Sequence, residues 1–160
     1  MTLFVKDIMV TDFDTVHEDA HAEEAIFKIS NGAVRKSGYK NDALLVVDDT
    51  EKLVGIVTMF DVLYHLRPEY LNCGIDSETL NWKGQIKSLV DSFQGKKVHN
   101  FMSYNVQGAK LDDHVMIVLD RMIKNKFRRL PVLVDEKPIG LIYIADIYYH
   151  LFSKDKPHNR

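Results

Sequence analysis

Residues 55–66, Gly-Ile-Val-Thr-Met-Phe-Asp-Val-Leu-Tyr-His-Leu, recur 85 positions later as residues 140–151, Gly-Leu-Ile-Tyr-Ile-Ala-Asp-Ile-Tyr-Tyr-His-Leu. Gly, Asp, Tyr, His and Leu are identical in the two stretches, and most other positions exchange one apolar residue for another. A repeat of this kind indicates two copies of one structural unit. Positions that both copies keep are candidates for a shared structural or binding role, and positions that differ show where the copies have diverged.

The duplication extends towards the N-terminal side of each copy. Val5-Lys-Asp-Ile-Met9 corresponds to Val98-His-Asn-Phe-Met102 at an offset of 93. At the same offset, apolar residues with i, i+3, i+4, i+7 spacing predict one amphipathic helix per copy. These residues are Ala22, Ala25, Ile26 and Ile29 in the first copy and Val115, Val118, Leu119 and Met122 in the second. Asp19 and Asp112 precede the stripes, and we expect them to accept hydrogen bonds from the first-turn N–H groups.

Two short runs of β-forming residues follow the helix in each copy. They cover residues 43–47 and 53–57 in the first copy and 130–134 and 138–142 in the second, and a charged turn joins each pair into a predicted hairpin. The offset falls from 93 at the helices to 87 at the first of these strands. The first copy therefore carries six extra residues between its helix and its hairpin. Loops accept such insertions easily.

Composition places the chain among ordinary globular proteins. Its 160 residues are 46% hydrophobic and 28% charged, with a formal net charge of −2 and a pI of about 6.4. We therefore expect no nucleic-acid partner and no electrostatic attraction to a membrane. No apolar run reaches the roughly 18–20 residues of a membrane-spanning helix, and the first residues lack the features of a signal peptide. With Cys73 as the one cysteine, no internal disulfide can form, and we expect a cytoplasmic protein.

The predicted organisation is a first repeat over residues 1–66, a linker over 67–97, a second repeat over 98–152 and a polar tail over 153–160. A partial apolar stripe in the linker predicts a helix from Ser77 to about Phe93, ended by Gly95. Each repeat buries one face of a small sheet, so we expect the two to pack through these faces with approximate two-fold symmetry. The expected fold class is α+β, built from two β-α-β-β-α repeats packed sheet to sheet.

Thr58 and Asp61, at the junction of the second hairpin strand and the last helix of the first repeat, admit two interpretations. They could form a capping box that satisfies first-turn N–H groups. They could also bind a ligand, because a helix N-terminus attracts phosphate and a carboxylate accepts both hydroxyls of a ribose. The second repeat has Tyr143 at the hydroxyl position, yet keeps Asp146. A carboxylate that persists without its capping partner favours the ribose interpretation, although favourable placement against the helix dipole explains it in part.

A basic stretch, Asn125-Lys-Phe-Arg-Arg-Leu-Pro-Val132, precedes a predicted strand of the second repeat. Two interpretations stay open: a solvated basic loop, or an anion clamp in which Arg128 or Arg129 binds a phosphate. Pro131 falls at the start of the strand, where its missing N–H is tolerated. At an offset of 87 the first repeat has Asn41 and Asp42 opposite the two arginines. A clamp in the first repeat would therefore need other lysines or residues of the second repeat.

The chain resembles a pair of cystathionine-β-synthase (CBS) domains, also called a Bateman module. The resemblance rests on the order of elements and on three motifs: Gly-x-x-Thr-x-x-Asp at residues 55–61, Asp-Ile-Met at residues 7–9 and Arg-Arg-Leu-Pro-Val at residues 128–132. The resemblance covers residues 3–66 and 96–152. It implies repeats that pack through their sheets and leave two clefts that often bind adenosine-containing ligands. Association as flat homodimers through the helices is also implied.

The resemblance assigns roles to particular residues. Ribose would be held by Asp61 and Asp146, phosphate would face Thr58, Arg128 and Arg129, and the base would lie against strand residues. The complete set of expected ligand-binding residues is Thr58, Asp61, Arg128, Arg129, Pro131, Tyr143, Asp146, Asp14, Val16, Gly108 and Ala109. Tyr143 and Asp42 depart from the family pattern, which leaves open whether both clefts bind and whether they bind the same nucleotide.

Three classes of function follow. The first is a regulatory energy-sensing module that binds AMP, ADP or ATP and signals to an unidentified protein in trans; S-adenosylmethionine or NAD is an alternative ligand. The second is a small enzyme. The sequence argues against it, because it contains no nucleophile–base pair, no metal constellation and no Gly-rich phosphate loop. His17 and His21 are four residues apart, but His17 falls in a predicted strand, so the helical i, i+4 geometry of a metal site does not apply to them. The third is a ligand-free dimerisation module. Alanine at either aspartate is expected to remove binding while the protein stays folded.

Overall fold

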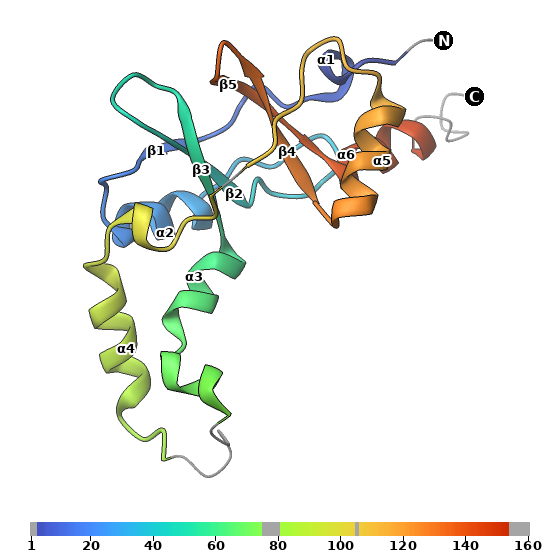
Figure 1. Ribbon diagram of the computed structural model, residues 1–160. Coiled ribbons are helices and arrows are strands. Elements are labelled where there is room, and N and C mark those ends of the chain that lie inside the picture. The colour runs from blue at the N-terminus through green and yellow to red at the C-terminus, as the bar shows by residue number, and fades with distance from the viewer. Residues whose placement is uncertain (1–2, 75–80, 105, 154–160) are drawn as a thin grey trace.

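The computed structural model describes residues 3–74, 81–104 and 106–153. The elements follow one another as α1 (Val5–Ile8), β1 (Thr15–His17), α2 (Ala22–Ser30), β2 (Ala43–Val47), β3 (Leu53–Thr58), α3 (Met59–Leu66), the 3-10 helix η1 (Glu69–Cys73), α4 (Gln85–Gln94), the 3-10 helix η3 (Val98–Asn100), α5 (Val115–Asn125), β4 (Arg129–Val134), β5 (Lys137–Tyr143) and α6 (Ile144–Phe152). Figure 1 shows the two repeats side by side, each with its own small sheet and helices. The expected α+β fold class is confirmed.

The two sheets are related but unequal. In the first repeat the strand order is β1-β2-β3, with β1 parallel to β2 and β2 antiparallel to β3. In the second repeat β4 and β5 form an antiparallel pair, and the counterpart of β1 is reduced to one parallel bridge between Ala109 and Val132. Both predicted hairpins are present. The second repeat therefore keeps the hairpin and the helices of the repeat but loses most of its first strand.

The opening segment of each repeat crosses to the other repeat. Val5, in α1, is fully buried in a core cluster of the second repeat and donates its N–H to the Asp113 carbonyl at 2.9 Å. In return, Phe101 and Met102, which follow η3, lie in the core cluster of the first repeat. The Val98 N–H donates to the Ala20 carbonyl of the first repeat at 2.8 Å. Neither hydrophobic core is therefore complete without residues from the other half of the chain.

A third cluster joins the two repeats. It is formed by Leu45 of β2 and by Leu141 and Tyr143 of β5, all at most 3% exposed. The two repeated glycines lie at this junction. A Cβ added to Gly55 would come within 2.6 Å of the Met102 sulfur, and one added to Gly140 would come within 2.8 Å of the Val10 carbonyl oxygen. Both glycines are needed because the crossing segments run directly against the strands.

The predicted helices are present, but their caps differ from expectation. Ala22 and Ala25 of α2 and Val118 and Met122 of α5 are fully buried, as the apolar stripes predict. Asp19 and Asp112 do not cap these helices, because His21 and His114 occupy the N-cap positions. The His114 ring accepts a hydrogen bond from the Met116 N–H. The Asp112 carboxylate instead pairs with Lys6 at 2.9 Å, across the crossing segment.

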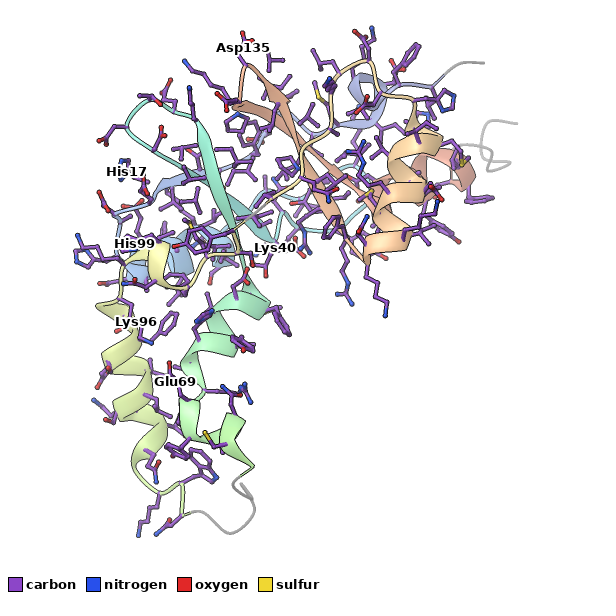
Figure 2. All side chains as sticks on the ribbon, viewed as in Figure 1. His17, Lys40, Glu69, Lys96, His99 and Asp135 are labelled. Carbon is purple, nitrogen blue, oxygen red and sulfur yellow. The ribbon has the colours of Figure 1, made fainter. Side chains whose placement is uncertain are left out.

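The region between the repeats projects from the body as an arm made of η1 and α4 (Figure 1). Within this arm, α4 lies beside α3. The predicted helix over residues 77–93 is only partly present. Residues 77–80 lie outside the described residues, and residues 81–84 are not helical because Gly84 has a φ of +78°. Figure 2 shows Lys96 at the base of the arm and Glu69 farther along it. No helix in the described ranges is long and apolar enough to cross a membrane.

Candidate functional site

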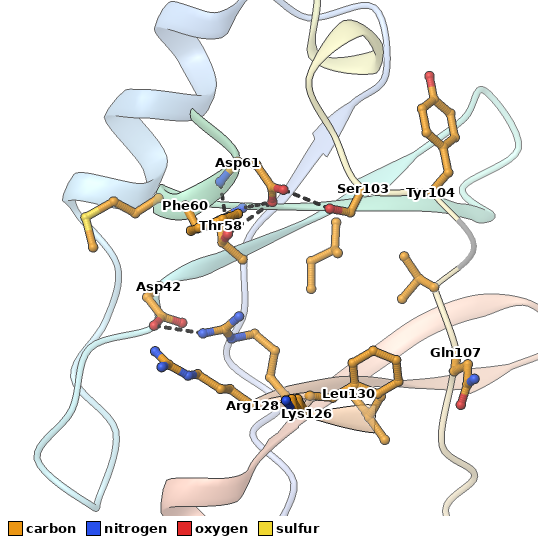
Figure 3. Close-up of a pocket in the computed structure, with 15 residues that line it drawn as sticks. Asp42, Thr58, Phe60, Asp61, Ser103, Tyr104, Gln107, Lys126, Arg128 and Leu130 are labelled. Atoms are coloured by element: carbon orange, nitrogen blue, oxygen red, sulfur yellow. Dashed lines mark hydrogen bonds and ion pairs between the residues drawn. The ribbon is translucent and has the colours of Figure 1, made fainter. Parts of the chain in front are cut away.

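A cavity of about 460 Å³ opens between the two repeats. We call it the Asp61 cavity, and Figure 3 shows it at close range. Its walls come from the β3–α3 junction, from the segment that leads into α5, and from the α5–β4 connection. The lining residues are Asp42, Ile56, Thr58, Met59, Phe60, Asp61, Ser103, Tyr104, Val106, Gln107, Lys126, Phe127, Arg128, Arg129 and Leu130. A volume of this size lies within the range of small-molecule sites in proteins.

Thr58 and Asp61 form the capping box that their spacing allows. The Asp61 carboxylate accepts from the Thr58 N–H at 2.8 Å and from the Thr58 hydroxyl at 3.0 Å. The Thr58 hydroxyl in turn accepts from the Asp61 N–H at 3.4 Å. The same two residues line the Asp61 cavity. The capping and ligand-binding interpretations therefore do not exclude each other, because the box uses one carboxylate oxygen, Oδ2, and leaves the other, Oδ1, for a further partner.

The remaining oxygen, Asp61 Oδ1, accepts a hydrogen bond from the Ser103 hydroxyl at 2.8 Å (Figure 3). Ser103 comes from the segment that crosses from the second repeat, where its N–H and carbonyl pair with Ile56 of β3. The carboxylate is thus held in one orientation by both repeats. Ser103 is exposed, so a ligand hydroxyl could take its place without opening the core.

The opposite wall of the Asp61 cavity is basic. Lys126 adopts a left-handed backbone conformation, with a φ of +58°, that ends α5 and turns the chain into β4. Lys126 and Arg128 are exposed, and their side chains have no ion pair within the described part of the chain. Arg129 pairs with the Asp42 carboxylate of the first repeat at 3.1 Å. Two unpaired cations and one neutralised cation therefore face the N-terminus of α3, whose dipole also favours an anion.

The equivalent aspartate of the second repeat lies in a different environment. Asp146, in the first turn of α6, is only 8% exposed. Both of its carboxylate oxygens accept from the Nε–H of Arg35, at 2.9 and 3.1 Å. The Arg35 guanidinium also lies over the Tyr143 ring, 3.6 Å from its centre. We call this group of Arg35, Tyr143 and Asp146 the Asp146 site.

Tyr143 explains why the Asp146 site lacks a capping box. It is the N-cap residue of α6 and makes no side-chain cap hydrogen bond. Its ring is buried between the repeats. Burial raises the pKa of the phenol above its ordinary value, and the nearby Asp42 carboxylate raises it further. The phenol therefore stays neutral and acts as a flat surface on which a cation stacks.

The expected ligand-binding residues divide into three groups. Thr58, Asp61, Arg128 and Arg129 line the Asp61 cavity, whereas Tyr143 and Asp146 belong to the Asp146 site. The third group, Val16, Ala109, Pro131, Gly108 and Asp14, makes contacts that belong to the fold itself. Val16 and Ala109 are at most 2% exposed in the two cores, Pro131 pairs with Leu141 in the sheet, the Gly108 carbonyl accepts from Arg121, and the carbonyl of Asp14 accepts from Leu45. Their role in binding stays a prediction.

Sequence reasoning missed the residues that complete both sites. Ser103, Tyr104 and Gln107 belong to an irregular crossing segment, which has no periodicity to mark it. Arg35 lies among the extra residues of the first repeat, and the length difference was the one available signal. His17, visible in Figure 2, bonds the Asp49 carboxylate at 2.6 Å. In the described ranges no cluster of histidine, cysteine and acidic residues is arranged to hold a metal.

The sequence matches the CBS domain family over residues 5–68 and again over residues 98–153. Inosine-5′-monophosphate dehydrogenase of Methanocaldococcus jannaschii is 30% identical over 142 residues, which are 88% of this chain and 22% of that enzyme. The chain thus spans about a fifth of the length of this curated relative.

Solved structures share the fold over nearly the whole chain. The structure of CBSX2 in complex with AMP has a TM-score of 0.67 at 20% identity, covering 96% of this chain and 99% of the other. The CBS domain pair of protein MJ0100, in complex with 5′-methylthioadenosine and S-adenosyl-L-methionine, has a TM-score of 0.65 at 24% identity, covering 98% and 100%. The sequence match over both repeats decides the assignment: the chain belongs to the CBS domain family, with one copy of the domain before the arm and one after it.

Proposed function

We propose that this chain is a non-catalytic regulatory module that binds one adenine nucleotide, of the AMP, ADP and ATP class, in the Asp61 cavity. The observation that carries the proposal is the pairing of an oriented carboxylate on one wall with a basic wall opposite it. A nucleotide has the complementary pattern, because its ribose offers two hydroxyl donors and its phosphates carry negative charge.

In this proposal the nucleotide contacts both repeats. The ribose hydroxyls donate to Asp61 Oδ1 and displace the Ser103 hydroxyl, so that one hydrogen bond replaces another. The phosphate lies between the α3 N-terminus and the side chains of Lys126 and Arg128. The base lies against the apolar part of the wall, which includes Ile56, Val106 and Leu130. A ligand bound in this way touches both repeats and biases their relative arrangement.

The readout of this binding is proposed to be another protein, in the cytoplasm, contacted by a homodimer of the chain. Large apolar side chains are exposed on both terminal helices of the repeats, with Phe60 of α3 at 73%, Tyr148 of α6 at 66% and Phe152 of α6 at 65%. Exposed apolar helix faces are typical of interaction surfaces. The same faces favour a second candidate function, a ligand-free dimerisation module.

A thermal-shift panel separates these functions. AMP, ADP, ATP, S-adenosylmethionine and NAD are added to the full chain, and a ligand at about 100 times its Kd should stabilise the fold by roughly 2.7 kcal/mol. The Asp61→Ala variant should lose this shift. The matched control is Asp91→Ala, which removes an exposed carboxylate of the arm whose one ion pair among the described residues is with Lys87 at 2.9 Å.

Three outcomes discriminate the proposals. A shift with an adenine nucleotide that Asp61→Ala loses and Asp91→Ala keeps supports the nucleotide module. A shift only with S-adenosylmethionine or NAD keeps the sensor but changes its ligand. No shift with any compound, together with a dimer in light scattering, favours the ligand-free module and contradicts nucleotide binding.

A further inference from the structure

The six extra residues of the first repeat fall within a compact loop over residues 31–42, between α2 and β2. The two sides of the loop are joined by hydrogen bonds from the Asn41 N–H to the Ala33 carbonyl and from the Arg35 N–H to the Tyr39 carbonyl, both at 2.8 Å. Gly38 turns the loop with a φ of +94°, a conformation that L side chains rarely adopt. The loop is therefore a defined structure that fixes where Arg35 starts.

From this loop the Arg35 side chain reaches the second repeat and ends in the Asp146 site. It is 9% exposed as a whole. Its Nε–H donates to both oxygens of Asp146, its Nη1 donates to the Lys40 carbonyl at 2.6 Å, and its guanidinium stacks on Tyr143. The buried guanidinium thus has a charge partner, a hydrogen-bond acceptor and an aromatic ring to stack on. Their combination, a carboxylate, a carbonyl and an aromatic face, is what a guanidinium prefers.

The Asp61 cavity has no counterpart of this arginine because the corresponding connection is too short. Twelve residues separate α2 from β2, whereas only residues 126–128 separate α5 from β4. Those three residues line the Asp61 cavity themselves, and two of them are basic. The unequal length of these two connections therefore makes the two sites unequal. The long connection supplies a cation to Asp146, and among the described residues the short one supplies none that pairs with Asp61.

We infer that Arg35 closes the Asp146 site to nucleosides, so that the chain binds one ligand rather than two. The inference rests on the proposed function for the ligand of the Asp61 cavity. A ribose would have to displace a guanidinium from a buried carboxylate, and its neutral hydroxyls would leave both charges without an opposite charge. Asn41 and Asp42, where the other repeat has Arg128 and Arg129, add no cation for a phosphate.

The test counts bound adenosine by calorimetry in the full chain. Adenosine is the probe because it tests the ribose contact without any contribution from a phosphate. Wild type should bind one adenosine, Asp61→Ala none, Arg35→Ala two, and the Arg35→Ala/Asp61→Ala double variant one. The matched control is Lys36→Ala, which removes an exposed cation of the same loop and should leave the count at one.

The counts separate the two proposals. A count of one in Arg35→Ala, or of two in wild type, overturns the role of Arg35 while nucleoside binding stands. A count of zero in wild type with one in the double variant overturns the Asp61 cavity as the site and supports the role of Arg35. Zero throughout, Arg35→Ala included, overturns the role of Arg35, and the thermal-shift panel with AMP, ADP and ATP then decides on nucleotide binding by itself.

A measurement on the unsubstituted chain covers the case in which Arg35→Ala does not fold. The Arg35 Nε–H should give a slowly exchanging proton resonance, because it is buried and bonded to a carboxylate. Saturating adenosine should leave that resonance in place, and Asp146→Asn should shift it. Loss of the resonance as the first equivalent binds would mean that the ligand displaces Arg35, which overturns the inference.

Discussion

Alanine at Asp146 is expected to destabilise the protein strongly, whereas alanine at the equivalent Asp61 should mainly remove ligand binding. The side chains of Arg35 and Asp146 are only 5% and 10% exposed. Removing the carboxylate leaves a buried guanidinium without the opposite charge that it pairs with, and breaking a buried pair in this way costs about 3–5 kcal/mol. For a chain of 160 residues, at about 2–4 °C per kcal/mol, the melting temperature should fall by roughly 6–20 °C.

Asp61→Ala should cost much less. Its carboxylate closes the capping box of α3 and bonds the exposed Ser103, but no buried charge depends on it. Loss of a cap costs about 0.5–2 kcal/mol, which corresponds to a fall of roughly 1–8 °C. The ion pair with Arg35 thus changes the expectation from sequence that either alanine variant would stay folded and lose binding.

Urea unfolding and calorimetric melting of both variants measure this contrast. A third variant, Arg35→Met/Asp146→Leu, removes the buried charges together and should recover most of the loss, because well-packed apolar side chains can replace a buried pair. If Asp146→Ala proves no less stable than Asp61→Ala, the two aspartates have equivalent environments and the reasoning is refuted.

Three further substitutions test other parts of the structure. Asp42→Ala frees Arg129 from its ion pair at 3.1 Å and should tighten ATP binding more than AMP binding in calorimetric titrations; equal effects would contradict a phosphate role for the basic wall. Burial and, to a lesser extent, a neighbouring lysine lower the pKa of His65 below the ordinary value of 6.5. The unfolded chain therefore binds the proton more tightly, and the free energy of unfolding should fall as the pH drops below about 6.5. His65→Gln should reduce this pH dependence in urea unfolding, and an unchanged slope would contradict the assignment. Gly140→Ala places a Cβ within 2.8 Å of the Val10 carbonyl and should cost about 1–3 kcal/mol in the same assay; wild-type stability would mean that the crossing segment can move away.

Sequence alone predicted the elements that carry a clear local pattern. The apolar stripe of Ala22 and Ala25 reflects burial of one helix face, and the hairpin of β4 and β5 follows from two β-forming runs joined by a charged turn. The capping box of Thr58 and Asp61 was one of two interpretations, and the structure shows that the same residues also line a cavity.

What sequence could not predict depends on contacts between distant segments. Nothing near Arg35 indicates that it pairs with a residue 111 positions away. The capping role expected of Asp19 was wrong because the helix begins two residues later than the acidic residue suggests, with His21 at the N-cap position. Loop residues and irregular segments lack a periodic signal, so their placement follows only from the packing of the two repeats.

The crossing of the opening segments has a consequence for the history and the handling of the chain. A protein severed within the arm would yield two fragments, each lacking part of its own core and carrying part of the other's. Such fragments should fold only after they recombine, which makes the arm a natural place to split the chain for a complementation reporter. By the same logic, an ancestor with one copy of the unit had to exchange this segment with a second molecule, so assembly in pairs would have preceded gene duplication.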